Sequence, residues 1–342
     1  MCKLLELSRQ FFPGQIDRLW NEDIFVYANV PYRIKSHEEI LKDPRNTVEF
    51  DRELSNRTEL EAASMGNDAK LLNDANGDIQ MATLAEKLLV PFLVKMSNFV
   101  PDGGVWLNTQ RPEWNDANNA LVGYGLSVVT TGYMRRYLGV IVDWVKDCNV
   151  NEFNISEDIL WLLSRIELAI SPYVEEGDTR ITAEQRQQIM GDLSKAGSRY
   201  RERIYERGLS GERNSVSRDA IIDFLLACRQ MIDNTLKSNR RSDGLFHCYN
   251  LMSLDVEGEV QIERLYEMLE GQVAVLSSGY LNPREAVALL DKLKSSALYR
   301  QDQQSYMLYP NRELPRFMEK NLVPAGLINQ SPLLFKLSLI HI

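Results

Sequence analysis

Apolar residues recur at every third or fourth position through most of the chain after residue 83. This spacing gathers them on one face of an α-helix, and such a face is buried against other elements. In the first of these segments, Leu84, Leu88, Phe92 and Met96 form the apolar stripe. The same pattern predicts further helices over residues 115–146, 156–172, 182–207, 219–237, 260–277, 282–296 and 314–320.

The predicted helix over residues 115–146 is apolar nearly all round, with Leu121, Leu138 and Trp144 on different sides of it. A helix that is apolar on every side lies at the centre of a protein. The Gly-Tyr-Gly at 123–125 falls inside this helix rather than after a strand, so it is not a dinucleotide-binding loop. Close packing against a neighbouring helix explains these glycines better.

Two of the predicted helices carry clear start signals. Thr182 and Gln185 have the spacing of a capping box, and Asn282 stands before Pro283 as an N-cap before a first-turn proline. Residues 243–262 look less helical, because they contain glycines and short strand-like pieces. The C-terminal half of the chain is therefore expected to alternate long helices with short links.

The N-terminal region has a different pattern. Its residues 24–27 favour a β-strand, and the polar run from Asn73 to Asp78 contains an Asn-Gly pair. That run lacks the spacing and the final glutamate of a calcium-binding loop, and Asn-Gly is a strong hairpin signal. We therefore interpret the run as a turn and residues 1–80 as an irregular region.

These segments predict an all-α fold: an array of helical hairpins over residues 81–330, with the irregular region 1–80 packed on it. Residues 331–342 are apolar and break the polar, turn-rich character before them. We interpret this tail as read-through, which suggests a fragment of a longer protein.

Composition limits the classes of partner. The chain is 44% hydrophobic and carries a formal net charge of −9, which argues against binding to nucleic acid or to anionic membranes. No apolar run is long enough to span a bilayer, and the four cysteines and three histidines show no zinc-site spacing. We expect no metal and, for the chain as it stands, a cytoplasmic location; a periplasmic or secreted one would need a longer N-terminus.

The segment with the strongest chemical signal lies between a glycine turn and the predicted central helix. Polar groups in such a place are costly unless they are paired or functional. Glu113 and Asp116 are three residues apart, so they share one face of a helical turn, with Trp114 between them. An acid beside an aromatic ring suits sugars, because rings stack on their apolar faces and acids protonate the glycosidic oxygen. Candidate substrate-binding residues are Arg111, Trp114, Asn115 and Asn119, and candidate catalytic acids are Asp116 and Glu113.

A purely structural role for this segment stays open. Asn115 or Asp116 would then cap the helix that follows, and Glu113 would form an ion pair with Arg111. A single cap does not need so many polar side chains, which favours the functional interpretation for the segment as a whole.

Glu113-Trp114-Asn115-Asp116 resembles the Asp-Trp-Asn-Asp motif of cellobiose and chitobiose phosphorylases. Those enzymes belong to the six-hairpin, (α/α)6-toroid glycosidases and phosphorylases. The resemblance covers about ten residues and implies that an acid of the motif protonates the oxygen of the leaving sugar. Because Glu113 replaces the first aspartate, the choice between the two acids stays open, with a slight preference for Asp116. The roughly eight predicted helices would make an incomplete toroid.

A second polar group of residues lies downstream. Asp243 and His247 share a short loop and are candidates for substrate contacts, although a lone histidine is more often structural. Glu270, three residues after Glu267, is a candidate general base, although both glutamates also suit a solvated helix face. An inverting hydrolase needs such a second carboxylate, whereas phosphate itself attacks in a phosphorylase.

The sequence therefore predicts a carbohydrate-active enzyme that cleaves a glycosidic bond by hydrolysis or phosphorolysis. Its substrate would be an oligosaccharide or glycoside, and it would need no cofactor other than inorganic phosphate as a co-substrate. The alternative is a non-catalytic helical scaffold or carbohydrate-binding protein in which the polar segment is structural.

Overall fold

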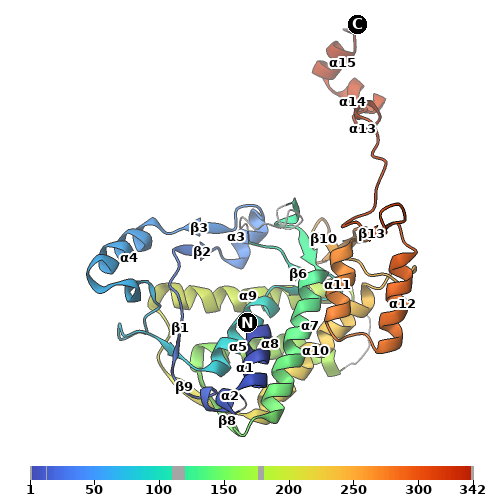
Figure 1. The fold of residues 1–342 in the computed structure, drawn as a ribbon. Coiled ribbons are helices and arrows are strands. Elements are labelled where there is room, and N and C mark those ends of the chain that lie inside the picture. The colour runs from blue at the N-terminus through green and yellow to red at the C-terminus, as the bar shows by residue number, and fades with distance from the viewer. Residues whose placement is uncertain (1, 13, 110–119, 176–180, 340–342) are drawn as a thin grey trace.

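The computed structural model describes residues 2–12, 14–109, 120–175 and 181–339. Long helices form most of the body, as Figure 1 shows, but the expected all-α toroid is wrong. Within the described residues the strands form one five-stranded and four two-stranded sheets, all with antiparallel pairing. The protein therefore combines helices with antiparallel sheets.

The five-stranded sheet joins segments that are far apart in the sequence. Its strand order is β11-β10-β7-β6-β5, so β7 pairs with a strand more than 120 positions later. Asn250 lies opposite Leu126 on one side and Arg264 on the other. The strands are β5 (Phe99–Val100), β6 (Gly104–Trp106), β7 (Gly125–Ser127), β10 (Tyr249–Ser253) and β11 (Gln261–Arg264).

The predicted central helix begins later than its apolar pattern suggests. Gly123 has a φ of +92°, and a Cβ there would lie 2.6 Å from the carbonyl oxygen of Pro44. Only glycine suits that combination of backbone conformation and close approach. The chain turns at Gly123 and forms β7, and the helix starts at Val128 with Ser127 as its N-cap. The glycines are closely packed, but Gly123 packs against the turn at Pro44 rather than against a neighbouring helix, and the helical placement of residues 123–125 was wrong.

Several predicted helices are confirmed, and the expected capping boxes at Thr182 and Asn282 are both formed. The prediction for residues 260–277 is only partly right, because β11 occupies its first part. The helices of the body are α5 (Leu84–Met96), α7 (Val128–Asp147), α8 (Glu157–Glu175), α9 (Ala183–Arg207), α10 (Arg218–Ser238), α11 (Leu269–Ser277) and α12 (Pro283–Lys294).

The main hydrophobic core lies between α5, α7, α8, α9 and α10. α7 packs on α10 and α11, and α8 packs on α9 and α10. Burial of these apolar faces, at about 25 cal/mol per Å², is the main force that holds the helices together. Fully buried members of the core include Phe92, Leu93, Leu138, Ile159, Ile166, Leu193, Phe224 and Ile232.

The N-terminal region is more regular than the sequence pattern suggested. It contains two small sheets and several helices, and the Asn73–Asp78 run forms the expected turn, with Asp74 accepting hydrogen bonds from the amides of Asn76 and Asp78. Its elements are α1 (Cys2–Phe11), α2 (Gln15–Leu19), β1 (Phe25–Val26), β2 (Tyr32–Ile34), α3 (His37–Lys42), β3 (Val48–Phe50), α4 (Arg52–Met65), the 3-10 helix η1 (Asn67–Lys70) and β4 (Met81–Ala82).

The N-terminal region lies across α9. In Figure 1, α9 runs through the middle of the body with α3, β2 and β3 beside it, and α3 is in contact with α9. This arrangement leaves two cavities between the N-terminal region and α9.

The remaining elements complete the surface. The three last helices project away from the body, as Figure 1 shows, and no helix in the described part of the chain is long and apolar enough to cross a membrane. These elements are β8 (Glu152–Ser156), which pairs with β9 (Arg213–Ser217), β12 (Tyr299–Arg300), which pairs with β13 (Ser305–Tyr306), and the projecting helices α13 (Phe317–Lys320), α14 (Ala325–Gln330) and α15 (Pro332–Leu339).

Candidate functional site

The segment with the strongest chemical signal lies outside the described residues, together with its candidates Arg111, Glu113, Trp114, Asn115, Asp116 and Asn119. The residues that lead into it are described. Asn108 is buried and donates a hydrogen bond of 2.6 Å to the side-chain oxygen of Asn98. Thr109, the next residue, lines a cavity. Thr109, at the wall of this cavity, is the last described residue before the segment.

The cavity beside Thr109 has a volume of about 510 Å³. It lies between the N-terminal region and the C-terminal end of α9, where Tyr205 is located. Its walls combine aromatic rings, a guanidinium group, an amide and aliphatic side chains. The residues that supply these groups include Asn29, Tyr32, Arg33, Ile34, Thr109 and Tyr205.

The polar contacts of this cavity fix its walls. The hydroxyl of Tyr205 accepts a hydrogen bond of 3.2 Å from the amide of Ile34, which ties β2 to α9. The guanidinium carbon of Arg33 lies 4.5 Å from the centre of the Tyr205 ring, in a cation–π contact. Arg33 also forms an ion pair of 3.1 Å with Asp51. Hydrogen bonds from the Leu54 amide and from Arg33 lower the pKa of Asp51, which keeps this carboxylate ionised.

Tyr32 provides the exposed aromatic surface of the cavity. Its side chain is 55% exposed, and its ring packs edge-on against Phe50 with 5.2 Å between the ring centres. An exposed ring that is held in place by a neighbour can stack on a ligand without first becoming ordered.

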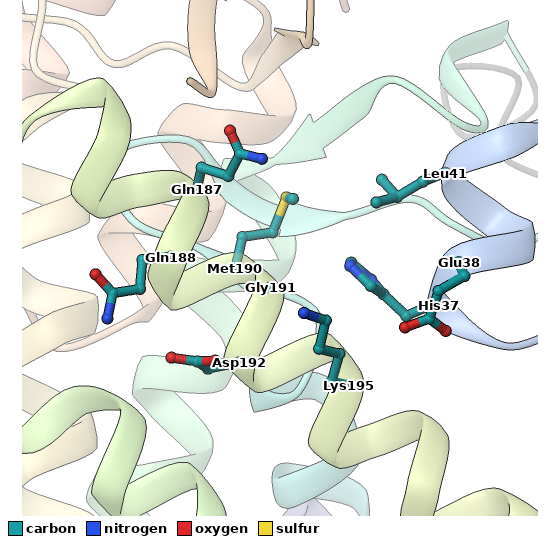
Figure 2. A pocket seen from close by; sticks show the side chains of 9 residues that line it. All are labelled: His37, Glu38, Leu41, Gln187, Gln188, Met190, Gly191, Asp192 and Lys195. Atoms are coloured by element: carbon teal, nitrogen blue, oxygen red, sulfur yellow. The ribbon is translucent and has the colours of Figure 1, made fainter. Parts of the chain in front are cut away.

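A second cavity, of about 420 Å³, lies between α3 and α9. Figure 2 shows the imidazole of His37 and the ammonium of Lys195 pointing into the space between the two helices. The Nδ1 atom of His37 lies 2.9 Å from the hydroxyl of Ser194, and burial of the ring lowers the pKa of His37. The other lining residues are Glu38, Leu41, Gln187, Gln188, Met190, Gly191 and Asp192.

The downstream candidate Asp243 belongs to a group of ion pairs. Its carboxylate accepts hydrogen bonds from Arg241, the shortest at 2.8 Å, and Arg241 also lies 3.0 Å from Glu267. Although partial burial acts to raise it, these hydrogen bonds bring the pKa of Asp243 below its usual value. Asp243 is therefore an ionised structural partner, not a free acid.

His247 and Glu270 lie near this group. The Nδ1 atom of His247 lies 2.6 Å from the carbonyl oxygen of Leu265, so Nδ1 carries the proton and Nε2 is the acceptor of the neutral ring. Burial lowers the pKa of His247, which favours this neutral form. Glu270 accepts a hydrogen bond of 2.8 Å from the hydroxyl of Tyr249. Asp243, His247 and Glu270 are not among the described residues that line the cavity beside Thr109.

Sequence reasoning missed a buried ionic cluster around Glu86. This side chain is 1% exposed, lies 3.2 Å from Arg213 and accepts hydrogen bonds from the amides of Thr83 and Ser156. Burial raises the pKa of Glu86, and it also raises the pKa of nearby Tyr27. The capping-box spacing of Thr83 and Glu86 is the signal in the sequence, but it predicts only a helix start.

No group of three or more histidine, cysteine, aspartate or glutamate side chains within the described ranges could hold a metal ion. The chain matches no protein-family model and no curated protein sequence.

Proposed function

We propose that the protein cleaves a glycosidic bond, and that the cavity beside Thr109 binds a sugar unit of the substrate. The observation that carries this proposal is the place of Thr109. It lines a cavity whose walls include the exposed ring of Tyr32 and the ion-paired guanidinium of Arg33, and it directly precedes the segment with the phosphorylase-like motif in the sequence.

The cavity has the properties of a site for a small polar ligand. Its volume of about 510 Å³ lies in the range of sites that bind small molecules, about 300–1,000 Å³. Tyr32 offers an exposed ring face, and Asn29 and Thr109 offer hydrogen-bonding groups around it. A sugar has apolar faces and a rim of hydroxyl groups, so this combination supports carbohydrate as the ligand class.

In the proposed reaction, Asp116 or Glu113 gives its proton to the glycosidic oxygen as the bond to the anomeric carbon breaks. An oxygen of water or of inorganic phosphate then forms the new bond to that carbon. Trp114 would stack on the sugar, and Arg111, Asn115 and Asn119 would orient its hydroxyl groups. Hydrolysis also needs a base that takes the proton of water; Glu270, the candidate from the sequence, does not line the cavity beside Thr109 and would have to act from outside it.

The test is a screen of oligosaccharides with the wild-type chain, with and without inorganic phosphate. Asp116→Asn and Glu113→Gln keep the shape of each side chain and remove the acid. We expect the variant at the true acid to lose about a hundredfold or more of the turnover, as general acids contribute about 10²–10⁴-fold. Turnover that needs phosphate identifies a phosphorylase, and turnover without phosphate identifies a hydrolase.

The cavity is tested separately with Tyr32→Ala. Tyr309→Ala is the matched control, because Tyr309 has the same exposed fraction of 55% and does not line the cavity. We expect only Tyr32→Ala to weaken the binding of the substrate found in the screen. Full turnover by both acid variants would reject Asp116 and Glu113 as the catalytic acid, and no turnover of any oligosaccharide by the wild type would reject the enzymatic role. Saturable sugar binding without turnover would instead identify a carbohydrate-binding protein.

A further inference from the structure

Gly191 leaves an opening in the wall of the cavity between α3 and α9. It stands four residues after Gln187 and four before Lys195, so the three share one face of α9, and all three line the cavity. Apart from its chain neighbours and its own helical backbone, a Cβ at Gly191 would have nothing within 4 Å. At Gly197 of the same helix a Cβ would lie 2.5 Å from the hydroxyl oxygen of Ser97, so close packing accounts for that glycine. No such contact with the described residues accounts for Gly191.

The consequence of this glycine is an open cavity. A glycine inside a helix is less favourable than alanine, because its backbone loses more conformational freedom on folding. At position 191 it keeps the space between Gln187 and Lys195 clear of a side chain. The volume of the cavity, about 420 Å³, lies in the range of sites that bind small molecules, about 300–1,000 Å³.

The polar groups around this space have no partners in the described part of the chain. Nδ1 of His37 contacts Ser194, whereas Nε2 has no hydrogen-bond partner there, although the residue is only 4% exposed. The amide of Gln187 has none either. The ammonium of Lys195 and the carboxylate of Glu38 form no ion pair with another described residue. A largely buried polar atom needs a partner, and a ligand in the cavity would supply one to His37.

One charge of each sign lines the cavity from opposite helices, with Lys195 on α9 and Glu38 on α3. Both charges act on His37: burial is the main cause of its lowered pKa, the charge of Glu38 opposes this lowering, and that of Lys195 adds to it. Asp192 also lines the cavity, but Figure 2 shows it pointing away from α3. A ligand that carries both an ammonium and a carboxylate therefore matches the cavity, whereas a ligand with a single charge leaves one of these groups unpaired.

The cavity also has an apolar part. Met190 from α9 and Leu41 from α3 both line it, and Figure 2 shows their side chains pointing toward one another across the space. A methionine adapts its shape to the group that it contacts. An aliphatic group of a ligand can therefore lie between these two side chains.

We propose that this cavity binds a free α-amino acid with an aliphatic side chain. The carboxylate of the ligand pairs with Lys195, its ammonium pairs with Glu38, and its side chain lies between Met190 and Leu41. Nε2 of His37 adds a hydrogen bond to one of the charged ends. Because Lys195 and Glu38 are exposed, each ion pair contributes little, and we expect a dissociation constant on the order of millimolar. The proposal concerns a different cavity from the sugar site and does not depend on glycosidic cleavage.

The experiment is a calorimetric titration of the full chain with L-leucine and, separately, with L-methionine. Two analogues of leucine each lack one charge: isocaproate has no ammonium, and isoamylamine has no carboxylate. Lys195→Gln and Glu38→Gln each remove one charge from the cavity, and Gly191→Leu places a side chain in its opening.

Two control variants match these changes outside the cavity. Lys42→Gln removes an exposed lysine of α3 that does not line the cavity. Gly139→Leu adds the same side chain at a helical glycine of α7, where a Cβ would have only Nη1 of Arg135 near it, at 4.0 Å. Both controls should bind the amino acids as the wild type does.

We expect saturable binding of at least one amino acid to the wild type, and binding at least about tenfold weaker to Gly191→Leu, because its side chain occupies the opening. Lys195→Gln should bind leucine about threefold more weakly and leave the binding of isoamylamine unchanged, since that analogue has no carboxylate to lose. Glu38→Gln should likewise weaken leucine and leave isocaproate unchanged.

Three results would overturn the proposal. The first is the absence of saturable binding of both amino acids at about tenfold above the expected dissociation constant. The second is binding of leucine to Gly191→Leu as tight as to the wild type. The third is binding of both analogues as tightly as leucine, which would show that the cavity does not recognise the two charges together. If Gly191→Leu does not fold, the comparison of Lys195→Gln and Glu38→Gln with the two analogues decides alone.

Discussion

The Nδ1 atom of His37 lies 2.9 Å from the hydroxyl of Ser194, and this contact joins α3 to α9 across 157 positions of the sequence. Both side chains are buried, at 4% and 3% exposed. The contact lies at the wall of the cavity between α3 and α9, because His37 and Lys195, the neighbour of Ser194, both line it. It therefore helps to hold α3 in the position that forms this cavity.

Replacement of His37 by alanine should weaken the folded state. The change leaves the Ser194 hydroxyl without this partner and removes a buried ring, so we expect the free energy of unfolding to fall by about 1–3 kcal/mol. Urea denaturation followed by circular dichroism measures the change. Lys42→Ala, on the same helix but exposed, is the control and should change stability by less than about 0.5 kcal/mol.

His37 should also make stability depend on pH in one direction. Burial lowers its pKa in the folded chain, so the unfolded chain binds the proton more readily. The resulting stabilisation is fully present above the unfolded pKa of about 6.5 and is lost as the pH falls toward the folded pKa. Because the pKa of His247 is lowered as well, both chains in the comparison carry His247→Gln. The chain that keeps His37 should lose stability below pH 6.5 more steeply than the chain that also carries His37→Gln. Parallel curves for the two chains would contradict this assignment.

Loss of the buried ion pair between Glu86 and Arg213 should lower the free energy of unfolding more than loss of an exposed ion pair. Arg213→Gln leaves the Glu86 carboxylate buried without its cation, and losses of about 3–5 kcal/mol are typical of such changes. Arg18→Gln breaks an exposed pair with Glu22 and should cost less than about 1 kcal/mol. Similar unfolding free energies for the two variants would show that the buried pair is not needed.

The sequence predicted helices well where the pattern is local. Capping residues such as Thr83, Thr182 and Asn282 are close to the residues that they cap, so their spacing alone fixes a helix start. The five-stranded sheet was missed because its strands have two to five residues and pair across long separations. Gly125 to Ser127 is apolar enough to continue a helical stripe, and its pairing with Val105–Trp106 on one side and Tyr249–Leu251 on the other makes it a strand. These partners cannot be inferred from local periodicity.

The site could be predicted only in part for a similar reason. Tyr32, Arg33 and Tyr205 come from segments more than 170 positions apart, and no local motif connects them. Arg201 lies in a highly charged helix, where an arginine is normally solvated. The Nε atom of Arg201 is nevertheless closed off from solvent, which only the folded structure shows. The sequence made Asp243 a candidate for substrate contacts and gave no sign of its pairing with Arg241, because that pairing depends on the turn between them.

The buried thiols should not react with thiol reagents while the chain is folded. Cys148, Cys228 and Cys248 are free and buried, and burial raises the pKa of Cys248 from 9.0 to about 12. The reactive thiolate of Cys248 is then about a thousandfold less populated than in an unfolded chain. In a Cys2→Ser background, Ellman's reagent at pH 8 should detect almost no thiol until denaturant is added, and three thiols afterwards. Rapid labelling without denaturant would show that the folded chain opens readily around at least one of these three cysteines.

Gly104 should tolerate no side chain, because two separate effects act against it. Its φ of +119° is outside the range that other residues adopt easily, and a Cβ there would lie 2.6 Å from the carbonyl oxygen of Ser127. Gly258 has a φ of +84°, but a Cβ there would have nothing within 4 Å, so Gly258→Ala isolates the backbone effect. We expect Gly258→Ala to cost about 1 kcal/mol and Gly104→Ala about 3 kcal/mol or more, since the latter also forces β6 away from β7. Thermal unfolding of both variants measures the difference. Equal melting temperatures would mean that the pairing of β6 with β7 can open far enough to admit a methyl group at little cost.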